Sequence, residues 1–184
     1  MRRTVNSTFI SIDGVINHME AWHFDYVDEE SDQIALETLA TSDALLMGRK
    51  TYEIYASAWP GRGGEIADKL NAMKKYVVSS TLDKADWANS TVINGDLVEE
   101  ITKLKNEPGD DIVMHGYGPV AATMVEHGLL DELHLWVHPA FAGVGTVSDM
   151  LFHEGINARL DLIKATPLRS GIVHLSYQVK SPTT

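Results

Sequence analysis

Two short glycine-containing segments carry the residues of this sequence that are best suited to binding an anion. The first, His115-Gly116-Tyr117-Gly118, follows the apolar run Ile112 to Met114 and leads into a helical pattern that begins at Pro119. The second, Gly48-Arg49-Lys50-Thr51, follows the apolar run Ala44 to Met47 and also leads into a helical pattern. A glycine turn at a helix start presents free backbone N–H groups and the positive end of the helix dipole. Both segments therefore predict phosphate sites, and the second adds two cations.

The first segment fits a dinucleotide-binding fingerprint only superficially. Gly116-x-Gly118-x-x-Ala121 has the required spacing, follows a predicted strand and opens a predicted helix. In a Rossmann fold, however, this motif lies in the first strand–helix–strand unit, and an acidic residue at the end of the next strand binds the ribose. Here the motif comes late in the chain, and the acidic pair Asp131-Glu132 precedes the next strand. The segment thus predicts a phosphate site without predicting a Rossmann fold.

The elements that must position these segments alternate between short apolar strands and helices. Strands are predicted at 5–12, 44–47, 76–78, 91–93, 112–114 and 133–138, and helices at 28–40, 52–58, 65–73, 97–105 and from Pro119 to just before Gly128. Alternation from Leu160 onward, the turn Ser170-Gly171 and the run Val173 to Val179 predict a C-terminal antiparallel hairpin, followed by a tail at 181–184. The pattern predicts one α/β domain over 1–184, with a mostly parallel mixed sheet, helices on both faces and ligands at the carboxyl ends of the strands.

Composition excludes several classes of function. The net charge is −11, whereas a nucleic-acid-binding domain is expected to carry a basic face. The chain has no cysteine, which excludes disulfides, thiolate catalysis and cysteine-type zinc sites. No signal peptide or apolar membrane span is visible in the sequence. We therefore expect a cytoplasmic protein that binds neither nucleic acid nor a membrane.

Other polar and aromatic residues allow two interpretations each. Trp22, Phe24 and Tyr26 alternate in an irregular segment, where they either close the edge of the core or line a substrate pocket. Asp13 is either a turn residue before Gly14 or a carboxylate that faces the ligand, and Asp32 is either a solvated helix residue or an acid of the site. The histidine pairs 18/23 and 134/138 lack a third ligand close in sequence, so no metal site is expected.

Several segments, in a consistent order, resemble one superfamily. Leu45 to Glu53 is similar to the MGRxTxE segment of dihydrofolate reductases, and Tyr76 to Leu82 resembles their next strand and its serine-rich end. Ser11 to Ile16, Gly128 to Leu133 and Pro139 to Gly145 resemble segments of the reductase domain of bifunctional riboflavin-biosynthesis proteins. The resemblance covers nearly the whole chain. It implies a dihydrofolate-reductase-like three-layer α-β-α sandwich, nearest to that riboflavin-pathway reductase domain.

The resemblance also implies an NADPH-dependent reductase and assigns residues to its cofactor. Gly48 would lie at the phosphate end of the cofactor, where Arg49 and Lys50 would meet the 2′-phosphate and Thr51 the pyrophosphate. Phe9 and Ile16 would line the nicotinamide. The remaining cofactor residues are Ser79, Ser80 and Thr81 beside the adenine ribose, and Gly116, Tyr117, Gly118 and Val120 on the other side of the pyrophosphate. In dihydrofolate reductases the turn that corresponds to 116–118 contains two consecutive glycines joined by a cis peptide bond. In this sequence Tyr117 occupies the position of the second glycine.

The implied substrate is a pyrimidine- or pterin-like heterocycle, reduced by hydride. The expected pocket residues are Trp22, Phe24, Tyr52 and Tyr55, and the candidate acids are Asp13 and Asp32, with water as the alternative proton source. The zinc-dependent deaminase half of the bifunctional proteins is excluded, because it requires cysteines. The resemblance implies a homodimer. The alternatives are a true dihydrofolate reductase and a nucleotide-binding module without turnover.

Overall fold

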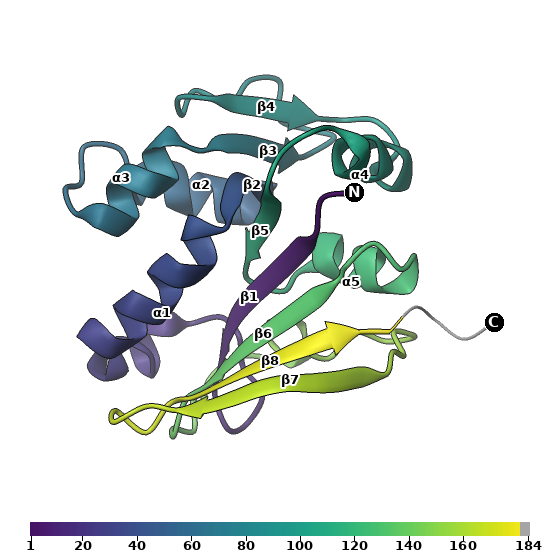
Figure 1. The fold of residues 1–184 in the computed structure, drawn as a ribbon. Helices are drawn as coiled ribbons and strands as arrows, with labels where there is room; N and C mark the ends of the chain where they lie inside the picture. Colours follow the sequence, from purple (N-terminus) through teal and green to yellow (C-terminus); the bar gives the residue numbers. More distant parts are fainter. Residues whose placement is uncertain (181–184) are drawn as a thin grey trace.

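The strands of the chain pair into one mixed sheet, which a computed structural model describes over residues 1–180 (Figure 1). The expected tail at 181–184 lies outside the described residues. The strands are β1 (Thr4–Ile10), β2 (Ser42–Gly48), β3 (Lys74–Val78), β4 (Ser90–Ile93), β5 (Asp111–His115), β6 (Glu132–Val137), β7 (Leu160–Pro167) and β8 (Val173–Val179). Within 1–180 they form an eight-stranded sheet in the order β4-β3-β2-β5-β1-β6-β8-β7. The strands from β4 to β6 in this order pair in parallel, and β8 and β7 add an antiparallel hairpin, as predicted.

Helices cover both faces of this sheet (Figure 1). They are α1 (Glu29–Ala40), α2 (Arg49–Ala58), α3 (Glu65–Ala72), α4 (Leu97–Asn106) and α5 (Pro119–Glu126), with 3-10 turns η1 (Met19–Ala21), η2 (Phe24–Tyr26) and η3 (Val147–Asp149). Helices α1, α2 and α3 pack on one face, and α4 and α5 pack on the other. The predicted three-layer α/β architecture is therefore confirmed. None of the described helices has the length and apolar character needed to cross a membrane.

Strand β2 shows why the central strands read as continuous apolar runs. Ala44 and Leu46 point toward α4 and α5, whereas Leu45 and Met47 point toward α1, α2 and α3. All four side chains are at most 1% exposed. A strand covered by helices on both faces needs apolar residues at every position, which removes the alternation of a half-exposed strand.

Local side-chain chemistry sets several element boundaries. Asp28 and Ser31 form a capping box at the start of α1, and the Asp96 side chain caps α4 by accepting the Glu99 N–H at 3.0 Å. Strand β1 ends at Ile10, two residues earlier than predicted, because residues 11–15 form a tight turn in which Gly14 has a φ of +86°. Helix α2 begins at Arg49 rather than at Tyr52, which places the two cations in its first turn.

Candidate functional site

Three predicted loops meet at one edge of the sheet. Strands β3, β2 and β5 are neighbours and run parallel, so the loops that follow them lie together at their carboxyl ends. These loops contain 79–81, 48–51 and 116–120, which are three of the segments expected to bind the cofactor. The edge also receives the N-termini of α2 and α5, whose first N–H groups have no partner within their own helices.

The two glycine loops face each other across a narrow space. A methyl group placed on Gly48 would lie 3.5 Å from Val120 Cγ2, and one placed on Gly116 would lie 4.0 Å from Thr51 Oγ1. Gly116 also has a φ of +78°, which disfavours any other residue at that position. Its carbonyl oxygen accepts a hydrogen bond from Asn6 Nδ2 at 2.8 Å. The space between the loops is thus lined by backbone and kept free of side chains at the two glycines.

Arg49 links the Gly48 loop to the loop after β3. Its Nε donates to Glu53 Oε1 at 2.7 Å, and its Nη1 donates to Thr81 Oγ1 at 2.6 Å. The arginine side chain remains 45% exposed, so one face of the guanidinium can still reach a ligand. Lys50 beside it is exposed to solvent. We call the two facing glycine loops, 48–51 and 116–120, the glycine cradle. Arg49 and Thr81 are in contact at its edge, and Lys50 follows Arg49 in the chain.

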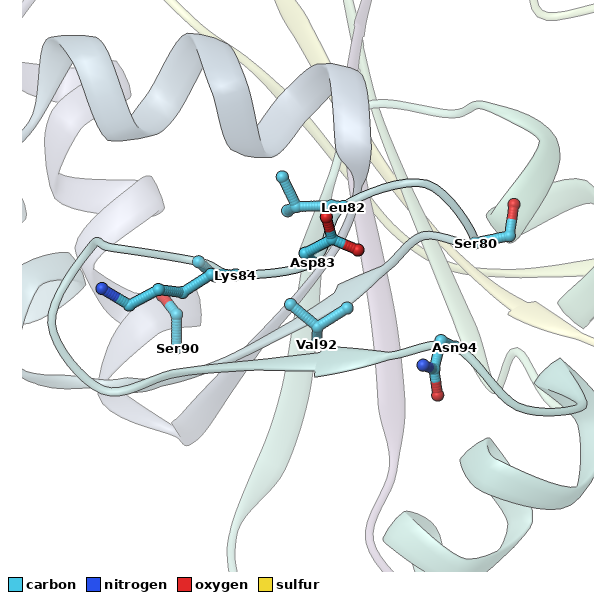
Figure 2. A pocket seen from close by; sticks show the side chains of 8 residues that line it. Ser80, Leu82, Asp83, Lys84, Ser90, Val92 and Asn94 are labelled. Atoms are coloured by element: carbon cyan, nitrogen blue, oxygen red, sulfur yellow. The ribbon is translucent and has the colours of Figure 1, made fainter.

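In the loop after β3, Ser79 stabilises the turn and Ser80 lines a pocket. Ser79 is buried, and its Oγ accepts the N–H groups of Thr81 at 3.2 Å and Leu82 at 3.0 Å, which closes the turn. Ser80 instead lines a pocket of about 530 Å³ beside the edge strand β4. Figure 2 shows Ser80 and Asn94 at one end of this pocket and Lys84 and Ser90 at the other. The pocket is lined by Ser80 and Leu82, the residues on either side of Thr81, and by Ser90 and Val92 of β4.

Tyr117 contributes only its backbone to the cradle. Its side chain is 7% exposed and packs against the His153 ring on the α5 face, with the ring centroids 5.3 Å apart. The Gly116–Tyr117 peptide is trans, so the cis bond known from dihydrofolate reductases is not found here. Gly118 is the residue at the N-cap position of α5 and has an extended conformation.

Phe9 and Ile16, both expected beside a nicotinamide, lie on opposite faces of the sheet. Phe9 belongs to the α1 face, where its ring centroid lies 4.2 Å from the His23 centroid and 5.7 Å from the Trp136 centroid. Ile16 is 6% exposed and packs into the core formed with α4 and α5. The turn at 11–15 directs Ile16 into this core, away from Phe9, and the assignment of both residues to a nicotinamide stays a prediction.

The four residues expected in a substrate pocket have different environments. Tyr52 is 5% exposed, and its hydroxyl accepts the Trp87 N–H at 3.0 Å, so it is a core residue. Trp22 is also buried, and its ring centroid lies 5.0 Å from that of His138. Phe24 is 66% exposed. Of the four residues, Tyr55 alone has a half-buried side chain in direct contact with the end of a central strand.

Neither candidate acid has the surroundings of a proton donor. Asp13 accepts hydrogen bonds from Ser11 Oγ at 2.5 Å and from the N–H groups of Ala142 at 2.9 Å and Gly143 at 3.0 Å. The Ser11 hydroxyl and these backbone groups lower the pKa of Asp13 to about 2, so the carboxyl stays ionised and fixes the loop after β6. Asp32 lies exposed in the first turn of α1. The structure does not bring the two acids together at the cradle.

No group of three metal-ligating side chains occurs within residues 1–180. His138 is instead paired with His23, whose Nδ1 lies 2.9 Å from His138 Nε2. The Trp136 carbonyl oxygen accepts the His138 Nδ1–H at 2.8 Å, so Nε2 must accept a proton from His23. This buried pair anchors the η1–η2 segment to the end of β6.

Comparison with known proteins assigns the family. The model of the RibD C-terminal domain family matches residues 3–174. The chain belongs to this family. YyaP, an uncharacterised protein of Bacillus subtilis, is 28% identical to it over 181 residues, which cover 96% of this chain and 94% of YyaP.

Solved structures confirm the fold of this RibD C-terminal domain. A pyrimidine reductase-like protein from Corynebacterium diphtheriae superposes with a TM-score of 0.73 at 14% identity, covering 98% of this chain and 93% of its own. Dihydrofolate reductase from Enterococcus faecalis, in a complex with NADP(H), gives a TM-score of 0.65 at 16% identity, covering 97% and 96%. The predicted dihydrofolate-reductase-like fold and family resemblance are therefore confirmed.

On the α1–α3 face of this domain, the sequence interpretation named Tyr55 but missed the polar residues near it, His115 and Ser7. Tyr55 Oη lies 2.9 Å from His115 Nδ1, and Trp136 Nε1 donates to Ser7 Oγ at 2.9 Å. Ser7 lies beside His115 in the β1–β5 register. The available signal was the alternation along β5, which places His115 on the same face as Val113, directly before the cradle glycine Gly116.

Proposed function

We propose that this RibD C-terminal domain is an NADPH-dependent reductase of a pyrimidine- or pterin-like heterocycle. The proposed reaction resembles that of 5-amino-6-(5-phosphoribosylamino)uracil reductase in riboflavin biosynthesis. One observation carries the proposal: two glycine loops at helix N-termini face each other, with Arg49 at their edge. The family and the dihydrofolate-reductase-like fold support it.

The described residues fit a dinucleotide phosphate group. A methyl group on either cradle glycine would occupy the space between the loops, and that space is bordered by Thr51 Oγ1 and by two helix N-termini. Gly48, Thr51, Gly116 and Gly118 would hold the pyrophosphate. Arg49 and Lys50 would hold the 2′-phosphate, because an arginine fork pairs well with phosphate oxygens.

The two ends of the cofactor would extend in opposite directions from this cradle. The adenosine end would pass Thr81 and Ser80 toward the pocket along β4 (Figure 2). The nicotinamide end would reach the face of the central strands near Phe9, and when bound it would supply a hydride to the substrate. Ser7, Phe9 and His115 are each only half-buried there, although they lie on central strands. The substrate is proposed to bind over them, beside Tyr55.

Arg49→Ala tests the cofactor assignment directly. Removal of a charge-assisted hydrogen bond to phosphate should weaken NADPH binding by about 10- to 100-fold. NADH binding should change less than about twofold, because NADH lacks the 2′-phosphate. Arg169→Ala, which changes an arginine with an 85% exposed side chain, is the matched control. An equal loss for both nucleotides would show that the assignment is wrong.

The two alternatives are separated by turnover. A panel of aminouracil ribosyl phosphate, dihydrofolate and oxidised pterin, each with NADPH, distinguishes the pyrimidine reductase from a dihydrofolate reductase. Binding of NADPH without oxidation by any member would favour the nucleotide-binding module.

We also propose that the protein acts as a homodimer. Strand β7 is at the edge of the sheet and pairs only with β8 among the described strands. Leu160, Leu162 and Ile163 on this strand are 40%, 57% and 56% exposed. An exposed apolar edge strand favours association with another chain.

A further inference from the structure

A tyrosine–histidine pair stands directly beside the cradle on the α1–α3 face of the sheet. His115 is the last residue of β5 and precedes the cradle residue Gly116. Tyr55 reaches it from α2, with 2.9 Å between Tyr55 Oη and His115 Nδ1 and 5.8 Å between the ring centroids. Both side chains are half-buried, so they are held in place while part of each remains accessible.

The direction of this hydrogen bond follows from the surroundings of the tyrosine. Within residues 1–180, the Tyr55 hydroxyl has no hydrogen-bond partner other than His115. Burial raises the pKa of Tyr55, so the phenol keeps its proton. Donation of that proton to Nδ1 is the arrangement that leaves no buried hydroxyl hydrogen unpaired. Burial also lowers the pKa of His115 to about 4, which makes its ring neutral at pH 7. A neutral imidazole that accepts at Nδ1 carries its proton on Nε2.

The Nε2–H group of His115 is available to a ligand. Among the described residues it has no hydrogen-bond partner, and the His115 side chain is only half-buried. A ligand on this face of the sheet can therefore reach it. Its neighbour Ser7 already accepts from Trp136 Nε1, and Phe9 lies two residues further along β1. A flat ligand lying over Phe9 would meet this one fixed N–H donor of His115 beside the glycine cradle.

We propose that His115 is a substrate-recognition residue, whose Nε2–H binds an acceptor atom of the heterocycle, and that Tyr55 positions it by fixing its tautomer. This inference rests on the proposed reductase function. The acceptor is a carbonyl oxygen or an unprotonated ring nitrogen conjugated to the carbon that receives hydride. Hydride addition moves an electron pair toward that acceptor, and a neutral imidazole N–H can stabilise the developing charge. The proton of the overall reduction then comes from water.

The tautomer is tested without any substrate. Nitrogen-15 NMR of the His115 imidazole should show one tautomer, protonated at Nε2, in the wild type. Tyr55→Phe should give a mixture of both tautomers, and the control Tyr177→Phe should match the wild type. A wild-type His115 protonated at Nδ1, or unchanged spectra in Tyr55→Phe, would overturn the positioning role.

The recognition role is tested with the panel substrate that the wild type reduces fastest. His115→Leu should lower kcat/KM by about 100-fold, as expected for losing a donor to a developing charge. Its Kd for NADPH should stay within twofold of the wild type. His115→Gln, which keeps an N–H donor, should recover at least tenfold. Tyr55→Phe should lose activity to a smaller extent.

The outcomes separate the inference from the function on which it rests. If the wild type reduces a substrate and His115→Leu retains its kcat/KM, the recognition role is wrong and the reductase function stands. If the wild type reduces none of the panel, the proposed function and the recognition role both fall. A loss in His115→Leu that arises from weaker NADPH binding would also overturn substrate recognition.

Discussion

Glu53 offers a sharp test of the cofactor site, because its removal should improve binding. Its carboxylate accepts from Arg49 Nε at 2.7 Å, and it lies one helical turn after the cradle loop. In the proposed complex, the 2′-phosphate approaches the same guanidinium. Glu53 therefore competes for Arg49 and also repels the phosphate. We predict that Glu53→Gln binds NADPH more tightly than the wild type.

The expected gain is modest and can be estimated from two contributions. The exposed Arg49–Glu53 ion pair, four residues apart in a helix, is worth roughly 0.3–0.5 kcal/mol. The wild type loses this energy when the phosphate takes the guanidinium, whereas Glu53→Gln does not. Repulsion between a carboxylate and a doubly charged phosphate about 6 Å apart costs about 1.4 kcal/mol in water. Salt near physiological strength reduces this term to about half. Together they give about 1 kcal/mol, or about fivefold in Kd.

The assay is a titration of tryptophan fluorescence with NADPH and with NADH. Glu53→Gln should tighten NADPH about fivefold and leave NADH within twofold, and the gain should shrink in 1 M salt. Glu37→Gln, an exposed change on α1, is the control. In an Arg49→Ala background the gain should fall to the repulsion term, about two- to threefold. Unchanged NADPH affinity in Glu53→Gln, or an equal gain for NADH, would refute the placement of the 2′-phosphate at Arg49.

Four further predictions concern stability and assembly. Lys75 is fully buried, and its Nζ donates to three carbonyl oxygens, so Lys75→Met should cost about 2–4 kcal/mol in urea unfolding at pH 7; a neutral effect would contradict this role. Burial lowers the pKa of Lys75 to about 8, so the unfolded chain binds more protons than the folded chain between pH 8 and 10.5. The free energy of unfolding of the wild type should therefore rise relative to that of Lys75→Met as the pH is raised through this range. Burial first, and then the charge of His138, lower the pKa of His23 to about 4; its contribution to stability is present above pH 6.5 and should be lost as the pH falls toward 4, and His23→Gln should show a shallower fall than the wild type. Ile163→Lys on β7 should convert the proposed dimer to a monomer in sedimentation equilibrium, whereas a monomeric wild type would disprove the dimer.

The order of elements was predictable because its signals are local. A strand buried on both faces needs a continuous apolar run, and β2 supplies one. Helix α1 begins where Asp28 caps it, and α5 begins where Pro119 fits the first turn. The glycine cradle was predictable for the same reason. The positive φ of Gly116 is a local backbone property that favours glycine, so the residue type itself is a signal.

The faces and the contacts were harder to predict, because they depend on residues far apart in sequence. Tyr52 and Tyr55 lie on the same helix and both suit a pocket, but three residues of helical rotation direct Tyr52 into the core and Tyr55 toward His115. Asp13 allowed both a turn and a ligand-facing interpretation. The groups that decide between them are N–H donors about 130 residues further along the chain. The periodicity of a sequence cannot predict such a long-range contact.

The central claim is most directly tested by titrating the wild-type protein with NADPH and with NADH. Energy transfer from its four tryptophans to the reduced nicotinamide reports binding of either nucleotide. The proposed function predicts saturation at micromolar NADPH, with NADH binding at least tenfold more weakly. The absence of binding by either nucleotide at millimolar concentration would contradict it.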